Sequence, residues 1–133
     1  MKNGRLLARI VFLLYLAAVL YLCFGKFSDI SSLGKHVLGI ESDKVVHFLM
    51  FLPFPVLFYM AFGLKTRNAW HSMLLALAIL ALGSLIAAGT ELVQDLIPYR
   101  ASDIADFRAD FIALCISAAV TFFIDLSKTT CHA

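Results

Sequence analysis

The stretch MLLALAILALGSLIAAGT, residues 73–90, carries no charged side chain and decides the fold class. A helix of about 20 mostly apolar residues is long enough to cross the hydrocarbon core of a bilayer. Backbone polar groups in that core must be bonded within the segment, so a single apolar run of this length is expected to be a helix. We therefore predict a transmembrane helix that extends over about residues 72–96.

Three further apolar runs flank this stretch and complete a transmembrane domain. Of the 133 residues, 62% are hydrophobic and 15% are charged, a balance that a soluble domain of this length does not need. The last run reaches spanning length when the preceding turn joins it. We predict one all-α domain, residues 1-133, that forms a four-helix transmembrane bundle with helices at about residues 6–24, 43–64, 72–96 and 103–126.

Two of these runs carry local features that bear on their structure. The first follows Lys2 and Arg5, as the core of a signal peptide would, but no small-residue cleavage site comes after it. We therefore interpret it as a retained helix. The second contains Pro53 and Pro55, and proline removes helix hydrogen bonds and kinks the axis. Such a kink can widen one end of the bundle into a cavity, or it can be an ordinary irregularity of a membrane helix.

The charge distribution predicts the orientation. Short loops follow the positive-inside rule. With the N-terminus in the cytoplasm, the inner side holds six Lys and Arg residues and one acid, Asp125, whereas the outer side holds five Lys and Arg residues and eight acids. We predict that both termini are cytoplasmic and that a polar site faces outward. A net charge of +2 without a basic stripe gives no case for a nucleic-acid partner.

Asp43 and His47 open the second predicted helix. They lie four residues apart and therefore share a helix face. An acid one turn away can orient a histidine for general-base catalysis, metal binding or pH sensing. The structural alternative is a polar helix start whose histidine bonds to the neighbouring helix.

Glu91, Gln94 and Asp95 share a face at the outer end of the third predicted helix. The helix dipole disfavours acids at a C-terminus, and such local conflicts tend to mark functional sites. The alternative is a structural ion pair in which Arg100 neutralises Glu91.

Asp103, Asp106 and Asp110 form one stripe along the fourth predicted helix. The first two suit a helix N-terminus, where free N–H groups and the dipole favour anions, and this accounts for them structurally. Asp110 lies deeper in the membrane, where a carboxylate needs a partner or a proton.

Together these residues form three short motifs in order, each at an outer helix end: Asp43-Lys44-x-x-His47, Glu91-x-x-Gln94 and Arg100-x-x-Asp103-x-x-Asp106. This order resembles the VanZ-like family of small bacterial membrane proteins over about residues 42–119. The family pattern continues with an asparagine and a glycine, where this chain has Asp110 and Ala113. The site is therefore more acidic than the family pattern.

The resemblance implies a multi-pass protein of the bacterial cytoplasmic membrane whose site faces the exterior. The family is named for a protein linked to resistance to teicoplanin, a lipidated glycopeptide. The implied function is binding of a lipid-linked or lipidated ligand: a glycopeptide antibiotic, a phospholipid headgroup or a cell-wall precursor. We expect the ligand-binding residues to be Lys44, Gln94, Arg100, Asp103 and Asp110.

The alternative is a membrane-embedded hydrolase or transferase that acts on an envelope lipid. His47 would be the general base, and the further catalytic candidates are Asp43, Glu91 and Asp106. A divalent cation is a third hypothesis, because one histidine with several carboxylates can hold such an ion. No spacing in the sequence is diagnostic of a metal site.

Overall fold

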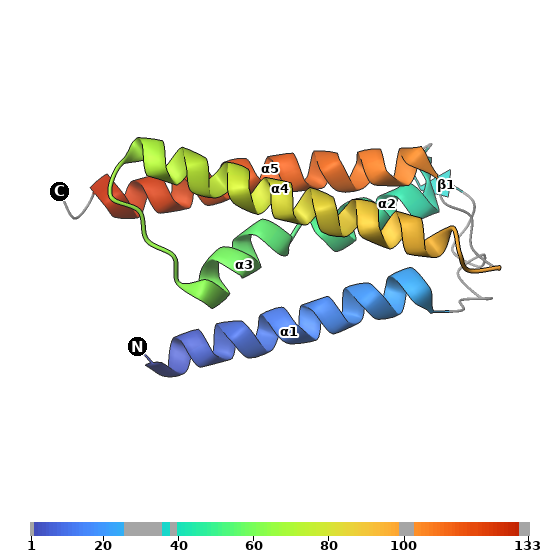
Figure 1. Ribbon diagram of the computed structural model, residues 1–133, viewed down its shortest axis with the longest axis horizontal. Coiled ribbons are helices and arrows are strands. Elements are labelled where there is room, and N and C mark those ends of the chain that lie inside the picture. The colour runs from blue at the N-terminus through green and yellow to red at the C-terminus, as the bar shows by residue number, and fades with distance from the viewer. Residues whose placement is uncertain (1, 26–35, 38–39, 99–102, 131–133) are drawn as a thin grey trace.

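The computed structural model of the chain describes residues 2–25, 36–37, 40–98 and 103–130, and Figure 1 shows their arrangement. Within these residues the chain forms helices and two very short strands. In chain order these elements are α1 (Lys2–Phe24), β1 (His36–Val37), β2 (Ile40–Glu41), α2 (Ser42–Phe51), α3 (Phe54–Phe62), α4 (Ala69–Gln94) and α5 (Ile104–Thr130).

The predicted number of membrane spans is confirmed in the described part of the chain. Four helical segments are long and apolar enough to cross a bilayer, and α2 and α3 together make one of them, Ser42–Phe62. The all-α prediction is confirmed as well, since β1 and β2 are only two residues long each and pair antiparallel, with His36 opposite Glu41. The composition and length of the helices fit a multi-pass membrane protein.

The second span is broken rather than continuous from 43 to 64, and two prolines cause the break. Pro53 precedes α3 as its N-cap, and Pro55 has no backbone N–H to donate. One turn before the break, the Tyr15 hydroxyl of α1 donates to the Met50 carbonyl at 2.7 Å. A side chain of the first span thus bonds to the polar backbone of the second, within a region where water is excluded.

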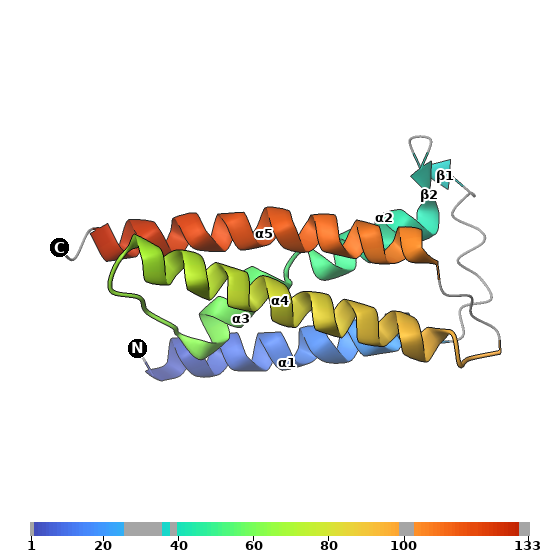
Figure 2. The same ribbon diagram turned by 45° about the horizontal axis from the view of Figure 1, so that its top comes forward.

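The helix α5 packs along α4, α2 and α3, while α1 packs chiefly on α3, as Figure 2 shows. Phe54 and Leu114 are fully buried where α3, α4 and α5 meet. Gly83 of α4 permits this close approach, because a Cβ atom there would lie 2.6 Å from Leu114 Cδ2. The outward faces stay apolar, with Leu85 and Phe123 largely exposed, as lipid-facing helices require.

The start of α1 and the end of α5 lie at the same end of the bundle (Figure 1). The connection between α3 and α4 is also at this end. It begins at Gly63, whose backbone is left-handed with φ 59°, and it ends at Asn68, whose side chain accepts from the His71 N–H and caps α4. The opposite end carries β1, β2 and the described residues of the three sequence motifs.

Candidate functional site

His47 of α2 is the centre of a buried polar cluster between α2, α4 and α5. Only 4% of its surface is exposed. Its Nδ1 atom lies 3.2 Å and 3.3 Å from the two carboxylate oxygens of Asp110, and 3.7 Å from Glu91 Oε1. The hydrogen-bonded partner of His47 is therefore Asp110 of α5, and not Asp43 one turn earlier on its own helix.

Two carboxylates of this cluster have buried oxygens without a regular hydrogen bond to any described residue. Glu91 is 8% exposed and Asp106 is 4% exposed. By distance and angle, both Glu91 oxygens and Asp106 Oδ1 have no hydrogen-bond partner among the residues that the structure describes, although the Asp103 backbone lies near the Glu91 carboxylate. A buried polar group without a partner costs free energy, and in native proteins such groups call for an explanation such as a bound ion or ligand.

The ligand-type atoms of the cluster lie close enough together to hold a metal ion. Asp43, His47 and Asp106 each place one such atom within 4.8 Å of the others, and so do His47, Glu91 and Asp110. Both sets contain His47. One imidazole with several carboxylates suits a divalent cation that accepts both nitrogen and oxygen, such as Mn²⁺ or Zn²⁺.

Lys44 and Asp103 form the solvent-facing rim of the site. Lys44 Nζ lies 3.3 Å from Asp103 Oδ2, which joins α2 to the beginning of α5. Asp103 Oδ1 also accepts from the Ala105 N–H at 2.9 Å. This backbone hydrogen bond and the bond from Lys44 lower the pKa of Asp103 below its usual value. Because Asp103 is exposed, the ion pair contributes little to stability.

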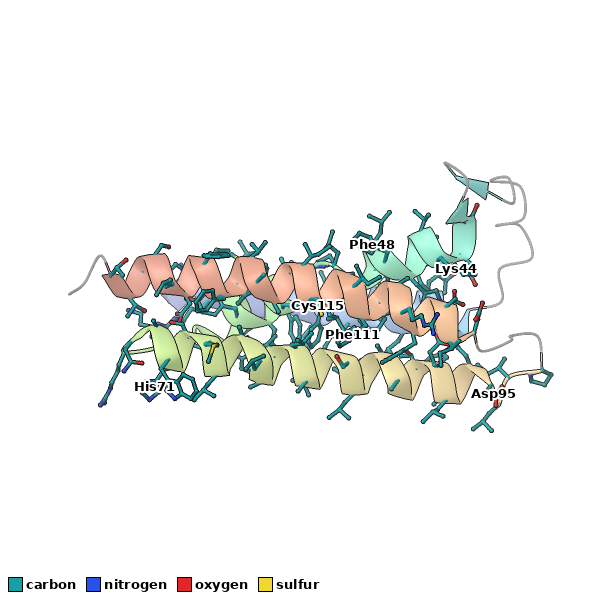
Figure 3. All side chains as sticks on the ribbon, turned by 90° about the horizontal axis from the view of Figure 1, so that it is seen from above. Lys44, Phe48, His71, Asp95, Phe111 and Cys115 are labelled. Atoms are coloured by element: carbon teal, nitrogen blue, oxygen red, sulfur yellow. The ribbon has the colours of Figure 1, made fainter. Side chains whose placement is uncertain are left out.

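Gln94 and Asp95 do not join the cluster. Gln94 is buried, but its Nε2 donates to the Cys23 carbonyl at 2.9 Å and so ties α4 to the end of α1. Asp95 is exposed at the C-cap of α4. Figure 3 shows Asp95 and Lys44 at the same end of the bundle and His71 at the other. Arg100, a predicted ligand-binding residue, lies outside the described residues.

An apolar cavity of about 320 Å³ adjoins the cluster between the end of α4 and the start of α5. Three acids, Glu91, Asp95 and Asp103, line it together with four apolar side chains: Ala88, Leu92, Ile104 and Phe107. Leu92 and Ile104 are largely exposed on the outer surface of the bundle. The cavity therefore connects the apolar exterior of the bundle with a carboxylate of the cluster.

Two polar features of the structure were not predicted from the sequence: the contact of Tyr15 on α1 and a polar network at the far end of the bundle. Tyr15 is half-buried on α1. No sequence motif pointed to it, because its hydrogen-bond partner is a backbone carbonyl 35 residues away. Asp125 of α5 is buried and accepts hydrogen bonds from Tyr59, Thr66 and Ser72. These donors come from three separate segments, so no local pattern could reveal them.

Comparison with known proteins assigns no family. No protein-family model and no solved structure matches the chain. An uncharacterised protein of the fission yeast Schizosaccharomyces pombe is 33% identical over 76 residues, which are 57% of this chain. The match covers 44% of that relative, so the chain spans less than half of its length. The relative is eukaryotic and its name states no activity, so it supports neither a bacterial source nor a function.

Proposed function

We propose that this chain is a VanZ-like membrane protein that binds the polar head of a lipid-linked or lipidated molecule at the His47 cluster. The observation that carries the proposal is the set of buried carboxylate oxygens on Glu91 and Asp106 that lack partners among the described residues. Folding places these groups beside an imidazole at the end of three spans. Ionisable residues in a membrane domain are costly and are usually kept for function.

The apolar cavity beside Glu91 supports a ligand with a hydrocarbon tail. The tail would lie against Ala88, Leu92 and Phe107, and the head would reach Glu91 and then His47. Ligand sites in proteins commonly combine apolar walls with a few polar groups that fix orientation. A cavity at the end of the spans also lies at the depth where lipid headgroups meet the acyl chains.

A divalent cation is part of the proposal, because the site is acidic. Asp43, Glu91, Asp106 and Asp110 surround His47, and Lys44 is already paired with Asp103. An anionic head, such as a phosphate, would be repelled by these carboxylates unless a cation lay between them. The two donor sets that share His47 are where such an ion would be held.

The cellular setting follows from the sequence motifs and the placement of Lys and Arg. We place the protein in a bacterial cytoplasmic membrane with both termini in the cytoplasm and the His47 cluster facing the exterior. A lipidated glycopeptide, a phospholipid and a cell-wall precursor all present a polar head and a tail at that surface. A role in teicoplanin resistance rests on the family resemblance alone.

One observation favours catalysis as a second candidate. The Asp110 carboxylate contacts His47 Nδ1 at 3.2 Å, as an acid that orients a general base would. No serine or cysteine of the described residues belongs to the cluster, so His47 would activate water or a substrate hydroxyl. The reaction would be hydrolysis or group transfer at the head of the lipid.

Binding is tested with Mn²⁺ as the probe, read by electron paramagnetic resonance on the purified full chain with and without a polyprenyl phosphate. The wild type should bind about one Mn²⁺, and the polyprenyl phosphate should tighten that binding, since coupled ligands raise each other's affinity. His47→Gln and Glu91→Gln should each weaken Mn²⁺ binding by about tenfold or more. His71→Gln changes an exposed histidine at the far end and should bind like the wild type.

The outcomes separate the two candidates. Equal Mn²⁺ affinity in the wild type and His47→Gln would contradict the proposal. The catalytic alternative predicts release of inorganic phosphate from a polyprenyl diphosphate by the wild type, with His47→Gln inactive. If the wild type binds the polyprenyl lipid and releases no phosphate, the protein acts as a binder.

A further inference from the structure

A second cavity, larger than the one beside Glu91, lies at the opposite end from the His47 cluster. It measures about 880 Å³ and opens where the start of α1, the end of α3 and the end of α5 meet. Four cations from three segments line it: Arg5 of α1, Lys65 and Arg67 of the α3–α4 connection, and Lys128 of α5. The positive-inside tendency explains why cations gather at one end, but it does not explain why they surround one cavity.

The acid that lines this cavity is occupied by other partners. Asp125 Oδ1 accepts from the Tyr59 hydroxyl at 2.9 Å, while Oδ2 accepts from Ser72 at 2.7 Å and from Thr66. Among the described residues, Arg5, Lys65 and Arg67 form no ion pair. The cavity therefore carries an excess of positive charge, because four cations face the single carboxylate of Asp125, whose charge acts on Lys128.

Contacts with neighbouring residues hold the cations around the cavity in place. The Asp125 network binds Thr66, which lies between Lys65 and Arg67 in the chain. Arg5 lies against Gly63, where a Cβ atom would be 3.0 Å from Arg5 Nε. Lys128 Nζ lies 4.8 Å from the centre of the Tyr59 ring, a cation–π contact that positions it.

We propose that this cavity binds a phosphate group. Arginine matches phosphate oxygens with two parallel N–H donors, and lysine adds a point charge, so Arg5 and Arg67 with Lys65 and Lys128 form a suitable set. Basic pockets between membrane helices bind phospholipid heads in this way. Ala8, Met60 and Leu64 supply an apolar wall for the glycerol and acyl parts of a lipid. The inference is independent of the proposed function, since the two sites share no residue.

The experiment measures the Tm of the purified full chain in phosphatidylcholine nanodiscs. Four additions are compared at matched ionic strength: phosphatidylglycerol, oleate, inorganic phosphate and chloride. Phosphatidylglycerol should raise the Tm above that in phosphatidylcholine alone, because a ligand that binds only the folded state stabilises it. In the double variant Arg5→Gln/Lys65→Gln, this increment should fall to about half or less.

Arg108→Gln is the matched control, since it removes an exposed cation at the other end of α5 and should keep the wild-type increment. If inorganic phosphate reproduces the cation-dependent increment, the group bound is free phosphate. If only phosphatidylglycerol does so, it is a lipid head. An unchanged increment in the double variant would overturn the proposal, as would an equal increment with oleate, which is anionic but has no phosphate. If the double variant does not fold, the exposed Arg67→Gln carries the same test.

Discussion

At the scale of single residues, the buried contact between His47 and Asp110 sets what the polar cluster can do. Asp110 is fully buried, and His47 is its hydrogen-bonded partner. A carboxylate in such a place is tolerated only when it is paired, protonated or bound to a cation. The VanZ-like pattern that the sequence resembles has an asparagine at this position, which would offer His47 one neutral oxygen in place of two acidic ones. The acid makes the site better suited to a cation.

This contact predicts the behaviour of two substitutions. Asp110→Ala removes the partner of a buried histidine, and we expect it to lower the free energy of unfolding by about 3 kcal/mol. Asp110→Asn keeps one oxygen that can accept from His47, and should cost only about 1 kcal/mol. Unfolding in mixed micelles with a denaturing detergent measures both values. An Asp110→Ala protein as stable as the wild type would show that the contact between His47 and Asp110 does not stabilise the fold.

The sequence predicted which residues belong to this cluster better than it predicted which of them contact each other. The i, i+4 spacing of Asp43 and His47 drew attention to the histidine, yet the ring bonds to a residue 63 positions away. Spacing reports which residues share a helix face, while a bond between helices depends on how α2 packs against α5. Gln94 illustrates the same limit, because it shares a face with Glu91 but bonds to the end of α1.

At the scale of elements, the apolar runs predicted all four spans. The structure differs from the predicted bounds at the break between α2 and α3 and at the ends of the spans. The third helix begins at Ala69 rather than 72, because Asn68 supplies the cap that starts it. The fourth ends at Thr130 rather than 126, since Ser127 and Thr130 satisfy carbonyls of the last turns with their hydroxyls. Runs of hydrophobicity locate a span, but caps and hydroxyl bonds set its ends.

Close packing of α4 against α3 and α5 predicts opposite effects for two glycines of one helix. A Cβ at Gly83 would meet Leu114 Cδ2 at 2.6 Å and Phe54 Cδ1 at 3.1 Å, both on fully buried side chains. Gly83→Ala should therefore destabilise the protein by about 1–3 kcal/mol. A Cβ at Gly89 would meet no atom within 4 Å, so Gly89→Ala should be neutral or slightly stabilising. Equal Tm values for the two variants would contradict this packing.

At the scale of the whole molecule, the bundle is polarised. One end gathers the carboxylates around His47, and the other end gathers Arg5, Lys65, Arg67 and Lys128 around a cavity. A net charge of +2 conceals this separation. Helices of this length would place the two ends on opposite sides of a membrane. The proposed ligands differ accordingly: a cation and its lipid ligand at one end, and a phosphate group at the other.

The charge separation, with the predicted orientation, leads to a testable pattern of cysteine labelling. In a background with the native cysteines changed to serine, Leu96→Cys should react with an impermeant thiol reagent added to the outside of intact cells. Arg67→Cys should react only after the membrane is opened. Both positions are exposed, so their access depends on the side of the membrane. The reverse pattern would place the His47 cluster in the cytoplasm and contradict the proposed envelope role.

The most direct test of the binding site is a high-resolution structure of the protein purified with its native lipids, inspected at His47, Glu91, Asp106 and Asp110. We predict density for a cation within ligand distance of His47 and at least two of the carboxylates. Density for a hydrocarbon tail should continue along Leu92 and Phe107. A cluster closed by protein hydrogen bonds to Glu91 and Asp106, with no density between the side chains, would contradict the account and make the carboxylates structural.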